Sequence, residues 1–151
     1  MEDIEDFKKS IGKKSRLLGI DPGKKRVGIA ISDENKLVST PLKTIIKKNN
    51  TSVINDILEI IKENNIKGIV VGNPINMDGS KGPSSQSAKD FAKNLSNNIS
   101  IPIVMWDERL SSQGAFNLSS NLNINTSKKV EKLDQNAASF ILQGAIDYIK
   151  R

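Results

Sequence analysis

Acidic residues at three points of the sequence have the surroundings that catalytic or metal-binding carboxylates need. The first, Asp21, ends a short apolar segment and is followed by Pro-Gly and by three cations, Lys24, Lys25 and Arg26. A charge at the end of a buried strand is costly unless it is paired or binds a metal, and the adjoining turn offers N–H groups and cations to a phosphate. The alternative is ordinary Asp-Pro-Gly turn chemistry, in which the carboxylate accepts a local hydrogen bond.

The other two acidic points lie in the second half of the chain. Asp107, Glu108 and Arg109 directly follow an apolar segment. Consecutive residues of a strand point to opposite faces, so only one of the two carboxylates can face a given site. A solvated charge cluster, with Arg109 paired locally, is the alternative. Asp134 is expected to open the last helix, where Asp is also a preferred N-cap, so a helix cap and a metal ligand require the same residue type there.

Two further segments are candidates for contacts with a substrate. The loop Gly72–Gly79 follows a buried apolar segment, at the end of a strand where open α/β sheets hold their ligands, and Asn76 is its candidate contact. Lys128 and Lys129 precede Asp134 in a polar stretch that would close over substrate. Ordinary turn chemistry in the loop and a solvated basic surface are the alternatives.

The composition limits the chemistry that is available. The chain of 151 residues has no cysteine and no histidine, which excludes thiolate nucleophiles, Ser-His-Asp triads and His-ligated zinc. Catalysis must therefore use carboxylates, hydroxyls and cations. The net charge of +6 favours a polyanionic partner such as nucleic acid, with a merely basic surface as the alternative. With one Trp and one Tyr, recognition of backbone and shape is expected rather than base-specific readout.

An α/β domain is needed to position these residues. Apolar runs bounded by turn residues predict strands, and apolar residues at helical spacing predict helices. The expected strands cover residues 17–21, 27–32, 36–45, 68–71 and 101–106, and the expected helices cover residues 50–64, 84–97, 111–118 and 134–149. A hairpin followed by alternating strands and helices indicates a mixed sheet of about five strands with helices packed on it. The length fits one domain, residues 17–151.

The first sixteen residues form a charged N-terminal arm before that domain. We expect a loosely held tail. The alternative is a short amphipathic helix, with Ile4, Phe7 and Ile11 on one face, that docks on the body or on a partner. The arm lacks the apolar core of a signal peptide, and no apolar run in the chain approaches the ~18 residues of a membrane span, so a cytoplasmic protein with no membrane partner is expected.

Taken together, the motifs resemble those of the YqgF family of ribonuclease H-like proteins, described as Holliday-junction-resolvase-like or as nucleases of pre-16S ribosomal RNA. The resemblance runs from Leu17 to about Tyr148. Its motifs appear in order as Gly19-Ile20-Asp21-Pro22-Gly23 with Arg26-Val27-Gly28, then Gly72–Gly79, then Asp107-Glu108-Arg109-Leu110-Ser111-Ser112, then Asp134-Gln135-Asn136-Ala137-Ala138. Two departures from the pattern occur: Asn73 stands where an apolar residue is expected, and Ser111-Ser112 stand where threonine is common.

The resemblance implies both a fold and a site. The fold is ribonuclease H-like, a five-stranded mixed sheet ordered 3-2-1-4-5 with strand 2 antiparallel and helices on its faces. The carboxylates that such a fold gathers map onto Asp21, Glu108 and Asp134. They would hold Mg²⁺ or Mn²⁺, hard ions that prefer oxygen ligands and need no histidine. Lys24, Lys25 and Arg26 would hold backbone phosphates, and Arg109 would either steady the scissile phosphate or pair with a carboxylate.

The expected function is metal-dependent hydrolysis of phosphodiester bonds in structured nucleic acid, at the 5′ end of pre-16S ribosomal RNA on a pre-ribosomal particle. A resolvase of branched DNA is one alternative, and an RNA-binding maturation factor without catalysis is another. A third arises because Gly-Ile-Asp-x-Gly also resembles the phosphate loop of actin-type and sugar-kinase-type ATPases. The length argues against it, since that architecture uses two such domains. Monomer and homodimer both remain open.

Overall fold

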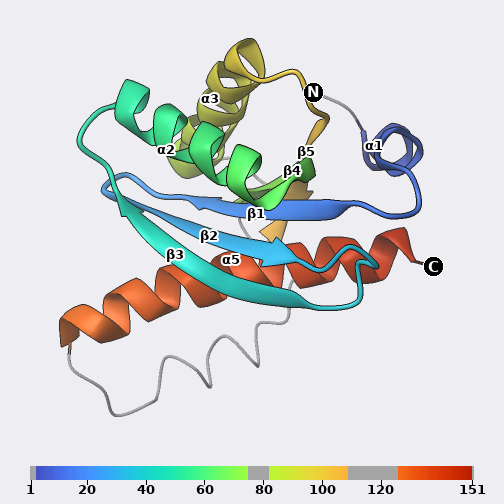
Figure 1. Ribbon diagram of the computed structural model, residues 1–151. Helices are drawn as coiled ribbons and strands as arrows, with labels where there is room; N and C mark the ends of the chain where they lie inside the picture. Colours follow the sequence, from blue (N-terminus) through green and yellow to red (C-terminus); the bar gives the residue numbers. More distant parts are fainter. Residues whose placement is uncertain (1–2, 75–81, 109–125, 151) are drawn as a thin grey trace.

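The computed structural model describes residues 3–74, 82–108 and 126–150, apart from the side chains of residues 126–132. Within these ranges the chain forms one five-stranded sheet with helices on both faces (Figure 1). The strands are β1 (Arg16–Pro22), β2 (Arg26–Ser32), β3 (Ser39–Ile46), β4 (Ile66–Asn73) and β5 (Ile103–Asp107). The helices are α1 (Ile4–Ile11), α2 (Asn50–Asn64), α3 (Pro83–Asn98) and α5 (Thr126–Ile149).

The sheet has the order β3-β2-β1-β4-β5. Strand β2 runs antiparallel to both β1 and β3, whereas β4 and β5 run parallel to β1. The predicted sheet order and the antiparallel second strand are therefore confirmed. Because β1, β4 and β5 are parallel, their C-terminal ends lie at the same edge of the sheet, which is where the acidic motifs following β1 and β5 must meet.

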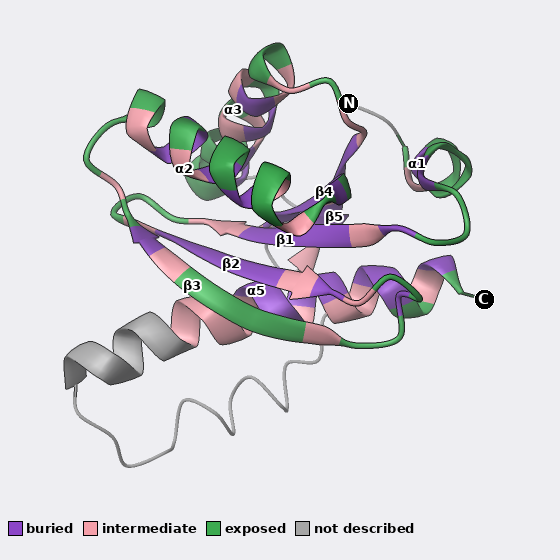
Figure 2. Ribbon diagram, viewed as in Figure 1, coloured by how far each residue is buried: buried purple, intermediate pink, exposed green. Residues whose placement is uncertain are grey.

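The two faces of the sheet carry separate hydrophobic cores (Figure 2). On one face α2 and α3 cover the side chains of Leu18 and Ile20, and on the other face α1 and α5 cover Leu17. Side chains alternate along a strand, so Asp21 belongs to the same face as Leu17, the face of α5. The alternation that builds the core thus also decides on which side the site lies.

The helix ends follow ordinary capping chemistry. The side chain of Asn49 caps α2 by accepting a hydrogen bond from the amide of Ser52 at 2.8 Å, and Asn65 ends that helix in the left-handed region with a φ of 53°. Pro83 starts α3 at a position where the missing N–H costs no hydrogen bond. The bounds of α2 and α3 agree with the prediction to within one residue. The predicted helix at 111–118 lies outside the described residues.

The N-terminal arm is packed against the body, so the expectation of a loosely held tail is wrong. Phe7 and Ile11 are buried in the core on the α5 face. They approach the backbone of β4 at Gly68 so closely that a Cβ there would lie 2.9 Å from Phe7 Cζ and 2.8 Å from Ile11 Cγ2. The amphipathic pattern of the arm is therefore satisfied within the chain, and burying each of these side chains contributes roughly 1.5–3 kcal/mol.

A buried lysine holds the end of the arm. The side chain of Lys36, only 5% exposed, donates hydrogen bonds from Nζ to the carbonyl oxygens of Gly12 and Lys13 and to Ser15 Oγ. These partners satisfy the ammonium group, although burial lowers the pKa of Lys36. The segment between α1 and β1 is thus fixed at both ends, by α1 packing and by Lys36.

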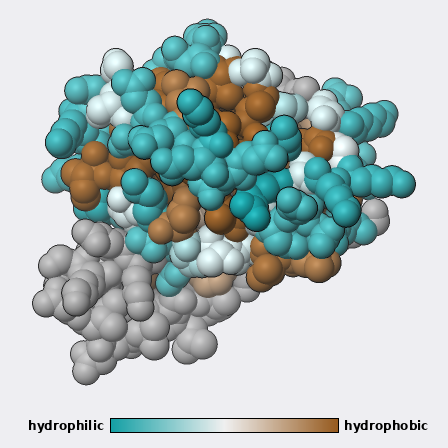
Figure 3. Space-filling view, viewed as in Figure 1, coloured by the Kyte–Doolittle hydropathy of each residue, from teal (hydrophilic) through white to brown (hydrophobic). Residues whose placement is uncertain are grey.

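Hydrophilic side chains predominate on the face of the molecule shown in Figure 3, and the hydrophobic ones there form separate patches. The large hydrophobic residues that are exposed lie mainly on or just before the edge strand β3, namely Leu37, Val38, Leu42 and Ile46. Among the described residues, no helix combines the length and apolar character that a membrane crossing requires.

Candidate active site

Two of the predicted carboxylates meet at the C-terminal edge of the parallel strands. Asp21 lies near the end of β1, and Glu108 directly follows β5. Glu108 continues the alternation of Val104 and Trp106, which are buried on the α5 face, and its side chain is hydrogen-bonded to that of Asp21. Asp107 points elsewhere and lines a hollow at the outer side of β5. Glu108 is therefore the member of the Asp-Glu pair that reaches Asp21.

A glycine in the intervening strand makes this contact possible. Strand β4 lies between β1 and β5, so the Glu108 side chain must extend over β4 to reach Asp21. A Cβ at Gly72 would lie 2.9 Å from Glu108 Oε1 and 2.6 Å from Ile141 Cδ1. The space that Gly72 leaves open is filled by the carboxylate and by α5. The sequence motif placed Gly72 in the site, but its role as a spacer beneath Glu108 emerges only from the strand order.

The Asp21–Glu108 pair shares a proton because burial disfavours two charges at this position. Burial, the proximity of Asp21 and, more weakly, that of Asp107 raise the pKa of Glu108 to about 8. Burial also raises the pKa of Asp21, whereas its hydrogen bond from Glu108 stabilises its charged form. Glu108 is thus the protonated member of the pair, and it donates a hydrogen bond to the carboxylate of Asp21. Perturbed carboxyl groups of this kind are typical of functional sites.

Asp134 lies near this pair but forms an ion pair with Arg26. Its Oδ2 accepts a hydrogen bond from Arg26 Nε at 2.7 Å, and its charge contributes to the raised pKa of Asp21. Arg26 and Gly28 lie two residues apart on β2, so both face α5. A Cβ at Gly28 would lie only 2.0 Å from the Asp134 carbonyl oxygen. Gly28 therefore lets α5 approach the sheet closely enough to bring Asp134 to the site.

The expectation that Asp134 opens the last helix is wrong, because α5 begins at Thr126 and Asp134 lies in its interior. The Lys and Glu residues between Thr126 and Asp134 are good helix formers, so the helix continues through a stretch that resembles a polar loop in composition. Asp134 therefore does not serve as an N-cap. Its position at the site comes from the packing of α5 on Gly28, not from a helix terminus.

The remaining predicted contacts fall into two groups. Lys24 and Lys25 lie exposed in the turn between β1 and β2, next to the carboxylates in sequence. Asn76 and Arg109 lie outside the described residues, as do the side chains of Lys128 and Lys129. Asn73, which stands where the family pattern has an apolar residue, is buried at the end of β4. Its Oδ1 accepts a hydrogen bond from Ser85 Oγ at 2.8 Å. This bond ties α3 to the sheet.

The arrangement thus brings Asp21 and Glu108 into contact, with Asp134 close by and paired to Arg26. Among the described residues, no group of three acidic side chains lies close enough together to hold a metal ion. Two adjacent carboxyl groups are nevertheless a donor set that suits a hard divalent ion, because oxygen is the ligand atom such ions prefer and the cation would relieve the repulsion between the charged forms. A mixed sheet in the order 3-2-1-4-5 with carboxylates at this edge defines a ribonuclease H-like protein.

Comparisons with known proteins agree with this class. The model of the RuvX family, described as "Holliday junction resolvase", matches residues 15–148. A relative from Pelagibacter ubique is 56% identical over 146 residues, which is 97% of each chain, and one from Ruegeria sp. is 44% identical over 147 residues, covering 97% of this chain and 94% of the relative. Both bear the name "Putative pre-16S rRNA nuclease".

Among solved structures, Thermus thermophilus RuvC shares the fold. One RuvC structure matches with a TM-score of 0.57 and 11% identity, covering 88% of this chain and 95% of RuvC. A second, in complex with a Holliday junction substrate, matches with a TM-score of 0.59, 11% identity and coverage of 89% and 94%. At this identity the likeness concerns the fold alone.

The chain belongs to the RuvX family, which is also called the YqgF family. The predicted family, the ribonuclease H-like fold and the nuclease class of enzyme are thereby confirmed. The alternative of an ATPase fragment loses its basis, because the Gly-Ile-Asp-x-Gly motif is accounted for by this family.

Proposed function

We propose that this protein is a divalent-metal-dependent endonuclease that processes the 5′ end of pre-16S ribosomal RNA in the cytoplasm, on a pre-ribosomal particle. The observation that carries the proposal is the contact between the half-buried carboxyl groups of Asp21 and Glu108 at the edge where the parallel strands end. The names of the relatives support the substrate. We assign the nuclease to residues 17–151, with residues 1–16 as an arm docked on it.

In this proposal Mg²⁺ or Mn²⁺ would be held by Asp21 and Glu108, with Asp134 as the third ligand once it is released from Arg26. When bound, the ion supplies an activated water and stabilises the departing oxygen of an in-line displacement. Lys24 and Lys25 bind phosphates of the nucleic acid on either side of the cleaved bond. When Asp134 binds the ion, Arg26 would exchange this carboxylate for a phosphate of the nucleic acid, because a guanidinium pairs well with either group.

Resolution of branched DNA is the second candidate, because the family model bears the description of a Holliday junction resolvase. The same carboxylates would serve both reactions, and the two differ in the shape of the nucleic acid. An RNA-binding role without catalysis is disfavoured by the Asp21–Glu108 pair, since burying two carboxyl groups in contact is costly and serves no purpose in binding a polyanion.

The test is cleavage of end-labelled substrates by the purified protein: a pre-16S ribosomal RNA fragment spanning the 5′ maturation site, a four-way DNA junction and a linear duplex. We expect cleavage of the RNA in Mn²⁺ or Mg²⁺, none after chelation, restoration by added Mn²⁺ and much weaker activity in Ca²⁺. The Asp21→Asn variant, purified in parallel, controls for contaminating nucleases. Full activity in excess EDTA would overturn the metal mechanism, and cleavage of the junction alone would favour the second candidate.

A further inference from the structure

A continuous groove runs from the β1–β2 turn to the space between α2 and α3. It consists of two adjoining hollows of about 210 Å³ and 220 Å³, which share the residues Lys47, Ser87 and Phe91. The first hollow begins at Pro22 and Gly23, immediately after Asp21, and the second continues along α3. We call it the α2–α3 groove. Of the residues that line it, only Lys24 has a part in the proposed chemistry.

We propose that the α2–α3 groove binds one unpaired nucleotide of the strand that flanks the cleaved bond. The inference rests on the proposed function in that it takes the ligand to be a nucleic acid. Each hollow is smaller than the roughly 300–1,000 Å³ of a pocket for a drug-sized ligand, so each suits one part of a nucleotide. One hollow is lined by lysine and serine side chains, which suit a phosphate, and the other contains an aromatic ring, which suits a base.

The hollow next to the turn suits the phosphate. It is lined by two lysines, Lys24 and Lys47, and by the hydroxyl-bearing Ser84 and Ser87. The position of Lys47 is fixed relative to the turn, because its backbone amide donates a hydrogen bond to the Lys25 carbonyl oxygen at 2.9 Å. Two cations and two hydroxyl groups facing one small space are a favourable environment for a phosphodiester.

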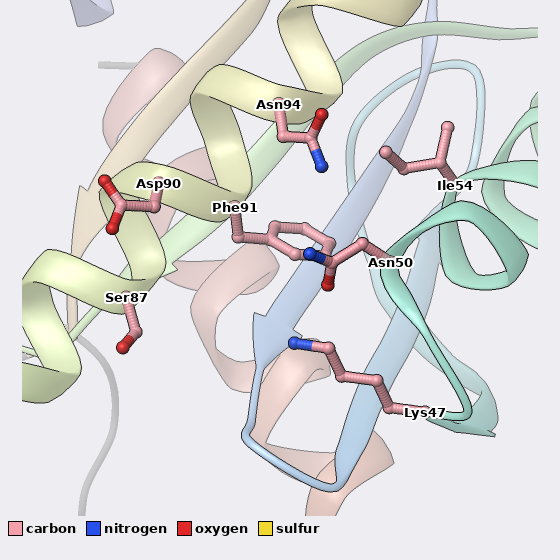
Figure 4. A pocket seen from close by; sticks show the side chains of 7 residues that line it. All are labelled: Lys47, Asn50, Ile54, Ser87, Asp90, Phe91 and Asn94. Atoms are coloured by element: carbon pink, nitrogen blue, oxygen red, sulfur yellow. The ribbon is translucent and has the colours of Figure 1, made fainter.

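The hollow between the helices suits the base. Phe91 presents its ring to this space, the apolar side chain of Ile54 lies across from it, and Asn50 and Asn94 line the walls (Figure 4). Asp90 also lines it, and a carboxylate repels a phosphate but accepts hydrogen bonds from the amino groups of bases. Stacking on an aromatic ring is available to every base, so this hollow would hold an unpaired base with little preference for its identity.

The groove and the carboxylates lie on opposite faces of the sheet, and the turn that carries Lys24 and Lys25 separates them. Asp21 belongs to the α5 face, whereas Phe91 packs against the core beneath α2 and α3. The turn, the start of α2 and the start of α5 lie at the same end of the sheet (Figure 1). A strand that contacts both sites must therefore pass over the lysines of the turn. Because a base that is paired in a duplex presents its edge and not its flat face to a protein, the strand must be single where a base stacks on Phe91.

Binding in EDTA tests the groove without requiring cleavage. The probes are a blunt RNA duplex and the same duplex with a five-nucleotide single-stranded extension at one end or the other, carrying 2-aminopurine in the extension. We expect one extended duplex to bind about tenfold more tightly than the blunt one, and its 2-aminopurine fluorescence to change on binding. Phe91→Leu should abolish both effects, Phe91→Tyr should retain them, and Lys47→Gln should weaken binding of the extended duplex more than that of the blunt one.

Two matched controls should behave like the parent. Lys48→Gln removes an exposed lysine next to Lys47 that does not line the groove, and Phe140→Leu removes a half-buried phenylalanine from α5, on the other face of the sheet. Thermal melting shows that each variant is folded. Equal affinity of the parent for blunt and extended duplexes, or an unchanged preference in folded Phe91→Leu, would overturn the inference. A failure to cleave any substrate would overturn the proposed function alone.

Discussion

Glu108 determines the charge state of the site, because it holds a proton that an exposed glutamate would lose. Burial is the main reason, and the nearby carboxylate of Asp21 is the second. The same features that make the pair costly to charge make it receptive to a divalent cation, which would replace the shared proton. Proton release and ion binding are therefore linked at this position.

This linkage predicts how stability depends on pH. The pKa of Glu108 is raised from 4.5 to about 8 in the folded protein, so between these values the folded state binds a proton that the unfolded chain has lost. The contribution is fully present below about pH 4.5 and is lost as the pH rises to about 8. In EDTA, the free energy of unfolding measured with urea should therefore fall between pH 5 and 8.

The matched variant is Glu108→Gln, which keeps a hydrogen-bond donor and cannot ionise. Its free energy of unfolding should vary much less over this range, and it should exceed that of the parent at pH 8. An equally steep fall in Glu108→Gln would place the responsible group elsewhere. The depressed pKa of Asp33 has the opposite effect, since the stability it contributes is lost as the pH falls below its ordinary value, outside this window.

Asp134 has two functions that substitution can separate: it is the partner of Arg26 and the proposed third ligand. We expect Asp134→Asn to remain folded in EDTA, with a free energy of unfolding within about 1 kcal/mol of the parent, because losing a partly exposed ion pair is offset by less repulsion on Asp21. The variant should lose nearly all Mn²⁺-dependent cleavage and most of the thermal stabilisation by Mn²⁺.

Arg26→Gln is the matched comparison for Asp134→Asn, since it removes the same ion pair and keeps the carboxylate. Its melting temperature should therefore still rise with Mn²⁺. Melting curves with and without Mn²⁺ distinguish the two variants, and cleavage assays on a substrate that the parent cuts complete the comparison. Normal cleavage by Asp134→Asn would remove Asp134 from the site and leave it as the partner of Arg26.

Helix α1 completes the core on the α5 face. Phe7 is fully buried there and contacts the backbone of β4 at Gly68. Phe7→Ala should lower the free energy of unfolding by about 3–5 kcal/mol, the usual cost of deleting a buried aromatic ring. Urea denaturation measures this, with Lys9→Ala on the exposed side of α1 as the control, expected within about 0.5 kcal/mol of the parent. A loss below about 1 kcal/mol for Phe7→Ala would mean that α1 is not an integral part of the core.

Much of this architecture could be predicted from local patterns, and the errors have physical causes. The alternation of Val104, Trp106 and Glu108 already assigns Glu108 and not Asp107 to the α5 face, a conclusion that requires only knowing which face α5 covers. The start of α5 at Thr126 could not be read from composition, since polar residues that favour helices also populate loops. The pairing of Arg26 with Asp134 depends on a contact between residues 108 positions apart, which no local pattern contains.

The cations of the molecule are unequally available to a polyanion. The chain carries a net charge of +6, yet Arg26 is engaged by Asp134 and Lys36 is buried against the arm. Lys24 and Lys25 are exposed at the end of the sheet that holds the carboxylates, whereas Lys62 and Lys67 belong to the end of α2 and the start of β4. Nucleic acid bound at the site should therefore contact the first pair and not the second.

The salt dependence of binding tests this distribution of charge. Each lysine that contacts a duplex phosphate releases counterions on binding, so neutralising it lowers the slope of log K against log salt by up to about 0.9. The double variant Lys24→Gln/Lys25→Gln should show a smaller slope and weaker binding to duplex RNA in EDTA, whereas Lys62→Gln/Lys67→Gln, with the same change in net charge, should keep the slope of the parent. Equal slopes for both double variants would show that binding senses the overall charge, and the β1–β2 turn would then be a structural connection between strands and not a contact with the substrate.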